Sequence, residues 1–143
     1  MAVHIDGQLC GALAMGREAG ADCGDAIMPT PMGDLAPAQC RSESGQEFML
    51  SGGVSPDLWL PQTPMQVFEE KVLEWLALKQ QSPRLIAGAG DQVPPGAEES
   101  RIARMRQLVE EYGRLLRATV TRRGSQRPFR RTGKVDRRRV GES

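Results

Sequence analysis

The chain has 143 residues, among them sixteen glycines, ten prolines and only six aromatic side chains. A formal net charge of +1 conceals a strong asymmetry: residues 114–143 carry eleven Arg or Lys against two acidic residues, and the rest carry eight against sixteen. This length suits one domain, and no run of about 18 apolar residues is present to cross a membrane. The charge division favours an anionic partner, a contact between the two halves, or both.

The first region, residues 1–61, is acidic and rich in Gly and Pro, with two arginines against eight carboxylates. Three prolines between positions 29 and 37 each remove a backbone donor and restrict the preceding residue. We therefore expect an irregular or disordered region, with room for a short helix around 8–18 and a short strand at 47–50.

The N-terminus also lacks the basic start and unbroken apolar run of a secretory signal, because Asp6 and Gln8 interrupt the apolar residues and no Lys or Arg precedes Arg17. We expect a cytoplasmic or nuclear protein that makes no membrane contact.

The second region begins with a clear helix start. Thr63 is a good N-cap, Pro64 suits the first helical position and Gln66 completes a capping box. The helix should run over about 63–81, because Ser82 is followed by a proline that ends it. Its apolar residues recur at steps of three and four and form one stripe: Met65, Phe68, Val72, Trp75 and Leu76.

A second helix is predicted over about 97–123. Acidic residues lie in its first turn and Arg122 and Arg123 in its last, and both placements suit the helix dipole. Gly113 is its weak point and Gly124 a plausible cap. Its apolar seam is about five turns long: Ile102, Met105, Leu108, Val109, Tyr112, Leu115, Leu116 and Val120.

These patterns predict a mostly α protein with two amphipathic helices. The organisation would be an irregular acidic region (1–61), a helical hairpin core (62–123) and a basic tail (124–143). Two helices cannot bury such wide apolar faces between themselves, which favours a homodimer or a helical protein partner. The alternative is that the stripe is ordinary core. The residues expected to bind a partner are Met65, Phe68, Val72, Trp75, Leu108, Tyr112 and Leu115.

The tail combines clustered arginine with one aromatic side chain, which is typical of a nucleic-acid arm. Arginine can pair bidentately with phosphate, and an aromatic ring can stack on a base. The alternative is a solvated basic terminus, or one that folds back on the acidic half. The expected contacts to nucleic acid or another polyanion are Arg122, Arg123, Arg127, Phe129, Arg130, Arg131, Lys134, Arg137, Arg138 and Arg139.

The segments LLRATVTRRG and FRRTGKVDRRRV, within residues 101–140, resemble the basic segment that precedes the von Willebrand factor A domain in some bacterial chelatase-associated proteins. That domain binds metal through a D-x-S-x-S loop, and no such motif occurs in this chain. The resemblance implies a truncated preceding segment of a larger protein that has lost its functional domain.

No cofactor or metal site is expected. The residue types of one possible zinc ligand set are present: Cys10, Cys23, Cys40 and His4. Gaps of twelve and sixteen residues separate the cysteines, however, whereas structural zinc sites pair ligands two to four residues apart. The Gly-rich segments lack the phosphate-loop pattern, and no scaffold is evident to hold a thiol beside His4. We therefore expect no enzyme activity.

The sequence thus predicts a non-enzymatic interaction module, in which helices associate with a second copy or a partner and the basic tail contacts an anionic surface. One alternative is a sequence-nonspecific nucleic-acid-binding protein whose helices only dimerise. The other is a truncated segment without independent activity.

Overall fold

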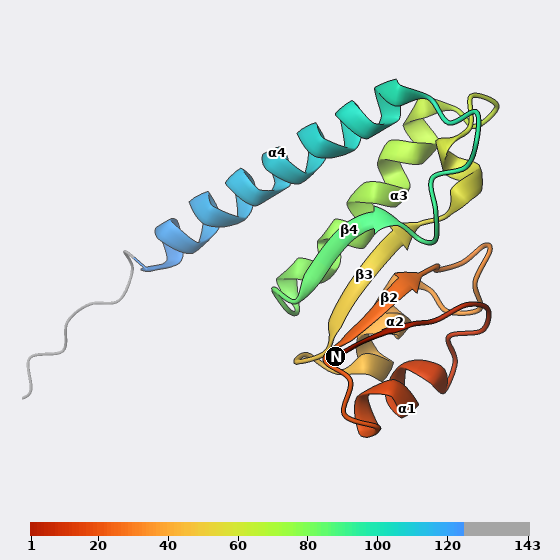
Figure 1. The fold of residues 1–143 in the computed structure, drawn as a ribbon. Coiled ribbons are helices and arrows are strands. Elements are labelled where there is room, and N and C mark those ends of the chain that lie inside the picture. Colours follow the sequence, from red (N-terminus) through yellow and green to blue (C-terminus); the bar gives the residue numbers. More distant parts are fainter. Residues whose placement is uncertain (125–143) are drawn as a thin grey trace, which may run out of the picture.

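The structure is a computed structural model that describes residues 1–124; in 115–124 it gives the helix but not the side chains. The described elements alternate between strand and helix (Figure 1). The strands are β1 (Ala2–His4), β2 (Cys23–Ile27), β3 (Met49–Val54) and β4 (Leu85–Ala89). The helices are α1 (Ala12–Glu18), α2 (Pro37–Ser44), α3 (Met65–Ala77) and α4 (Glu99–Gly124), with 3-10 turns η1 (Pro56–Trp59) and η2 (Leu78–Gln80).

The strands form one parallel sheet in the order β1-β2-β3-β4. Connections between parallel strands are almost always right-handed, so a chain that crosses the sheet in one direction places its connecting helices on one face. The fold is therefore α/β, and the prediction of a mostly α protein with two helices is wrong. The two expected helices are present, but they are two of the four α-helices in the described residues.

The largest error concerns residues 1–61, which we expected to be irregular or disordered. They contain three strands and two α-helices, of which α1 lies within the expected short helix at 8–18 and β3 overlaps the expected strand at 47–50. The proline-rich stretch does separate elements, and α2 begins at Pro37, where the missing N–H costs no helical hydrogen bond. The short strands were obscured because β1 has only three residues and because β2, β3 and β4 contain glycines, which sequence rules assign to loops.

The start of α3 differs from the expected capping box. Pro64 is the N-cap and makes no side-chain cap hydrogen bond. The Thr63 hydroxyl donates instead to the Asp57 carbonyl oxygen over 2.9 Å, and the Gln66 amide donates to Glu70. Thr63 thus ties the helix entrance to η1.

The core has two parts. The first lies between α1, α2, α3 and one face of the sheet, with Leu13, Cys40, Leu50 and Trp75 fully buried. The second lies between η1, α3, α4 and the end of β3, and centres on Phe68. Both parts therefore use the same face of the sheet.

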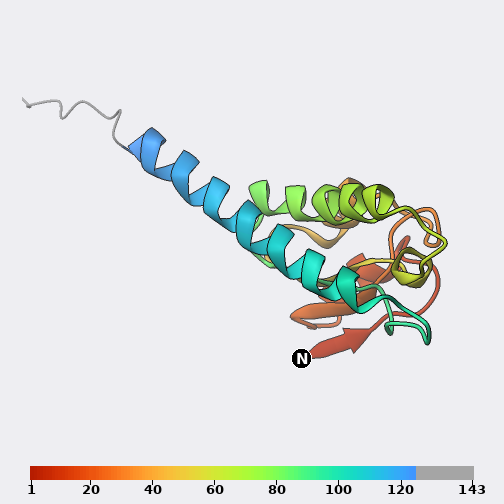
Figure 2. The same cartoon turned by 90° about the horizontal axis from the view of Figure 1, so that it is seen from above.

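Helix α4 packs along α3 and then extends away from the sheet, as Figures 1 and 2 show. Met105 and Leu108 are buried against α3, whereas Ile102 and Val109 are exposed. The buried Arg101 guanidinium lies over the Phe68 ring and donates to the Leu58 carbonyl oxygen over 2.9 Å. Within residues 1–124, no helix is both long enough and apolar enough to cross a membrane.

Candidate functional site

A group of titratable side chains lies at the carboxyl ends of the strands. In parallel α/β sheets this edge is where ligands bind, because loops from several strands meet there. His4 is the last residue of β1, Asp6 follows it, and Asp91 follows β4. One nitrogen or oxygen from each of the three lies within 4.8 Å of the others. We call these three residues the carboxyl-edge cluster.

The imidazole of His4 lies between two carboxylates. Its Nε2 is 3.3 Å from Asp6 Oδ1, and its Nδ1 is 3.5 Å from Asp25 Oδ2. Parallel pairing sets the second contact, because His4 on β1 lies directly opposite Asp25 on β2. Each ring nitrogen of His4 therefore has a carboxylate oxygen beside it, from Asp6 at Nε2 and from Asp25 at Nδ1.

Asp25 is itself held by its neighbours. A hydrogen bond from the Ser51 hydroxyl lowers the pKa of Asp25 below its usual range, burial opposes the shift, and His4 lowers the pKa further. An ionised carboxylate in this position can accept a hydrogen bond from the protonated Nδ1 of His4 and so fix the orientation of the ring.

Asp91 reaches the cluster from the opposite edge of the sheet. The Gly90 amide donates to the Val54 carbonyl oxygen over 2.6 Å, which turns the chain across the end of β3. A Cβ atom at Gly90 would lie 3.2 Å from the Ile27 carbonyl oxygen and from the Met28 side chain. Glycine thus lets the loop after β4 lie against the end of β2, and the next residue points its carboxylate at His4 and Asp6.

The donor set is chemically suited to a divalent cation. Zinc binds imidazole nitrogen and carboxylate oxygen at about 2.0–2.2 Å, so tetrahedral ligand atoms lie about 3.3 Å apart. The spacing between His4 Nε2 and Asp6 Oδ1 already equals this. All three members of the cluster are exposed, so a cation held by them would keep a coordination position for water or a ligand.

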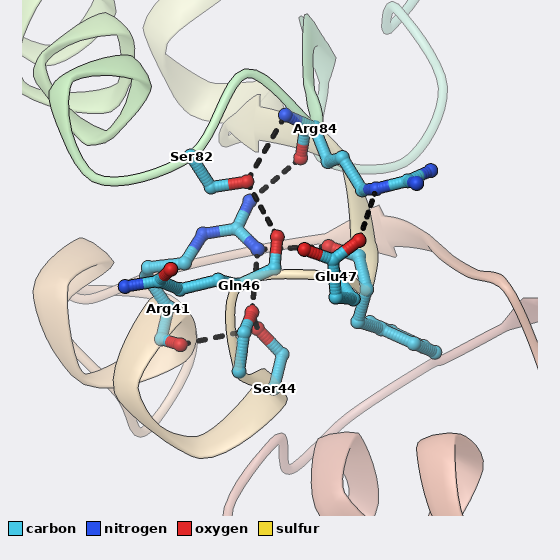
Figure 3. Close-up of polar contacts among 8 residues, drawn as sticks. Arg41, Ser44, Gln46, Glu47, Ser82 and Arg84 are labelled. Atoms are coloured by element: carbon cyan, nitrogen blue, oxygen red, sulfur yellow. Dashed lines mark hydrogen bonds and ion pairs between the residues drawn. The ribbon is translucent and has the colours of Figure 1, made fainter. Parts of the chain in front are cut away.

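The amino ends of the strands carry a different polar cluster (Figure 3). Arg41 is almost fully buried and donates to the carbonyl oxygens of Gly45, Phe48 and Arg84 at 2.6–2.8 Å. The Ser82 hydroxyl donates to the Gln46 carbonyl oxygen over 2.6 Å. These contacts join α2 to the segments that enter β3 and β4, so this cluster stabilises the fold.

A cavity of about 320 Å³ lies away from both clusters, between α2 and the end of α3. Its one charged lining residue, Glu74, is paired with Lys71 at 2.8 Å. None of its lining residues belongs to either cluster.

The structure places the expected partner-binding residues inside the chain's own core. Phe68, Val72, Trp75 and Leu108 are buried, and Met65 and Tyr112 pack partly buried against the second core. The side chain of Leu115 lies outside the described residues. This arrangement matches the alternative in which the apolar stripe is core.

The expected nucleic-acid contacts fall outside the described part of the chain. Arg122 and Arg123 belong to the last turns of α4, but their side chains are not described, and residues 125–143 are not described at all. The three cysteines carry no disulfide, and none belongs to the carboxyl-edge cluster.

No protein-family model matches the chain, and no curated protein matches it. The resemblance of residues 101–140 to a segment preceding a von Willebrand factor A domain therefore stays a prediction, and its residues 125–140 lie outside the described part of the chain.

Proposed function

We propose that the protein is a binding module that holds a divalent transition-metal cation, with Zn²⁺ the best fit, at the carboxyl ends of its strands. The observation that carries this proposal is the carboxyl-edge cluster, in which one imidazole and two carboxylates converge within 4.8 Å. Two of its members come from the β1 side of the sheet and the third from the loop after β4.

The environment of His4 supports the proposal. Metal-binding histidines usually give their second ring N–H to a carboxylate, which fixes the tautomer and raises the basicity of the ligating nitrogen. Asp25 occupies that position at Nδ1 and leaves Nε2 on the side of Asp6. Catalysis is not part of the proposal, and the expectation of a non-enzymatic protein stays a prediction.

The test is titration of the full chain, freed of metal with a chelator, with Zn²⁺ in a calorimeter. A Cys10→Ser background prevents binding at the exposed thiol from being counted. We expect one cation per chain, with affinity reduced at least tenfold by His4→Gln and by Asp91→Asn. Asp57→Asn is the matched control, because Asp57 is an exposed aspartate on η1, outside the cluster. Equal affinity in all variants, or no binding, would overturn the proposal.

Contact with a polyanion through the basic tail is a second proposed function. It is supported by the charge division along the sequence, with eleven cations in residues 114–143. This contact, and the reading as a truncated segment of a larger protein, rest on sequence alone.

Association with a second copy or a helical protein is also a proposal. The residues expected to bind a partner are largely buried in the chain's own core. Association would therefore use other surfaces.

A further inference from the structure

One face of the sheet carries no helix in the described part of the chain. Val3, Leu50 and Leu85 point to the face that packs against α1, α2 and α3. The neighbouring residue on each strand points the other way, so the opposite face shows a row with one residue from each strand. The row consists of His4, Asp25, Ser51 and Ile86.

Three of the four residues of this row are open to solvent, and Ser51 is half-buried. Ile86 is 51% exposed, although it lies within a strand, and His4 and Asp25 are exposed as well. Sheets made only of parallel strands occur almost entirely with both faces covered. We therefore expect other protein structure to pack on the uncovered face of this sheet.

The two edges of the sheet are open in the same way. Strands β1 and β4 each pair on one side only, and no other described strand lies beyond them. An edge strand presents a row of unpaired N–H and C=O groups, which is a template for a further strand. A partner that packs on the uncovered face and also pairs with β1 and β4 would account for both the open face and the open edges.

We propose that this partner is a second copy of the chain. In the dimer, β4 of each copy pairs in parallel with β1 of the other about a twofold axis that runs along the strands. The eight strands then form a closed parallel barrel with the helices outside and both uncovered faces inside.

The observations favour two copies over any other number. The strands follow one another in chain order across the sheet, so a second copy continues the same order past β4. Eight strands enclose an interior that side chains can fill, whereas twelve would leave a channel. Closed twofold assemblies are also the commonest oligomers.

The placement of α4 fits this continuation. Helix α2 packs beside α1, and α4 packs on α3 in the same way although no described strand follows it. In the dimer α4 would lie over the junction between β4 and the β1 strand of the second copy. Closure would thus complete the outer helical layer.

The test is sedimentation velocity of the full chain in the absence of metal, so that its result is independent of cation binding. We expect a species of about 31 kDa, twice the 15.6 kDa chain mass. Ile86→Lys should shift this species to the monomer, because the barrel, which already encloses Asp25 beside His4 and Ser51, would have to bury one further charge from each copy. Val67→Lys is the matched control, since Val67 is 38% exposed but lies on α3, which does not adjoin the junction with the second copy.

Hydrogen exchange adds a second measurement on the unaltered chain. Amides of β1 and β4 should become more protected as the chain concentration rises, because the edges pair in the dimer. A folded monomer at high micromolar concentration would overturn the proposal and leave another polypeptide as the partner. A dimer broken by Val67→Lys but not by Ile86→Lys would also overturn it and place the interface on α3.

Discussion

The indole ring of Trp75 lies directly against the backbone of Gly53, so that a Cβ atom at Gly53 would sit 2.2 Å from Trp75 Cδ2. Gly53 has φ +100°, a conformation that residues with side chains rarely adopt. The Trp75 Nε1–H donates to the Ile86 carbonyl oxygen over 3.1 Å. One fully buried side chain therefore joins α3 to both β3 and β4.

Trp75→Ala should lower the free energy of unfolding by about 3–5 kcal/mol, because it opens a cavity and leaves the Ile86 carbonyl oxygen without its donor. The comparison is Val67→Ala on the exposed side of the same helix, which should change stability by about 0.5 kcal/mol or less. Urea unfolding followed by circular dichroism measures both. A loss below 1 kcal/mol for Trp75→Ala would contradict the packing described.

Arg41→Met should also destabilise the fold, although it removes a buried charge. The guanidinium satisfies three carbonyl oxygens, and its loss leaves the buried ones unpaired at a cost of about 1–3 kcal/mol. Arg106→Met is the control, since Arg106 is 82% exposed and surface ion pairs contribute little. Equal urea midpoints for the two variants would show that the cluster at the amino ends is dispensable.

Helices α3 and α4 were predictable because their signals are local. Apolar residues recur at helical steps over 13 residues in α3 and 26 in α4, and the breaker Pro83 follows the first of them. The strands gave weaker signals, and only the start of β3 overlaps an expected strand, the one at 47–50. β1 has three residues, and the segments SGGV and LIAGA in β3 and β4 contain glycines that sequence rules assign to loops. Tertiary packing against Trp75 explains the glycine at position 53.

The candidate site could not be found from spacing, because Asp6 and Asp91 lie 85 positions apart. A weaker signal was present: His4 and Asp6 follow a short apolar start, and Asp91 follows a run of small apolar residues. Polar residues at the ends of such runs point to the carboxyl edge of a sheet only once the runs are recognised as strands. Misreading the strands therefore hid the site.

Acid should weaken the packing of α3 on α4. Arg104 Nε lies 2.6 Å from Glu69 Oε1, and this hydrogen bond lowers the pKa of Glu69 below its ordinary value of 4.5. A lowered pKa in the folded state gives stability that is present above pH 4.5 and lost as the pH falls through the lowered value.

Glu69→Gln should therefore reduce the acid sensitivity of the unfolding free energy below pH 4.5. Glu70→Gln, which removes a neighbouring carboxylate whose side chain is bonded to Gln66, should leave it unchanged. Urea unfolding at neutral and acid pH measures the difference. An identical acid response in the two variants would show that the pair with Arg104 contributes nothing.

Asp25→Asn should weaken Zn²⁺ binding by about 10–100-fold without removing a ligand, because the change affects the partner of His4 Nδ1. His4 is the only histidine, so a long-range ¹H–¹⁵N spectrum shows one imidazole. In the unaltered chain, Zn²⁺ should shift Nε2 while Nδ1 stays protonated. A shift at Nδ1 instead would assign the cation to the other nitrogen and contradict the role of Asp25.

Binding of the basic tail to nucleic acid should be governed by salt, because contacts to phosphate release counterions. On duplex DNA the log–log slope of affinity against salt is about −0.9 per phosphate contact, so seven contacts between Arg127 and Arg139 would give about −6. Replacing Arg137, Arg138 and Arg139 by Ala should flatten the slope by about three units and leave the circular dichroism spectrum unchanged. Absence of binding at low salt would favour pairing of the tail with the acidic half of the chain, whereas strong sequence discrimination would require contacts to base edges.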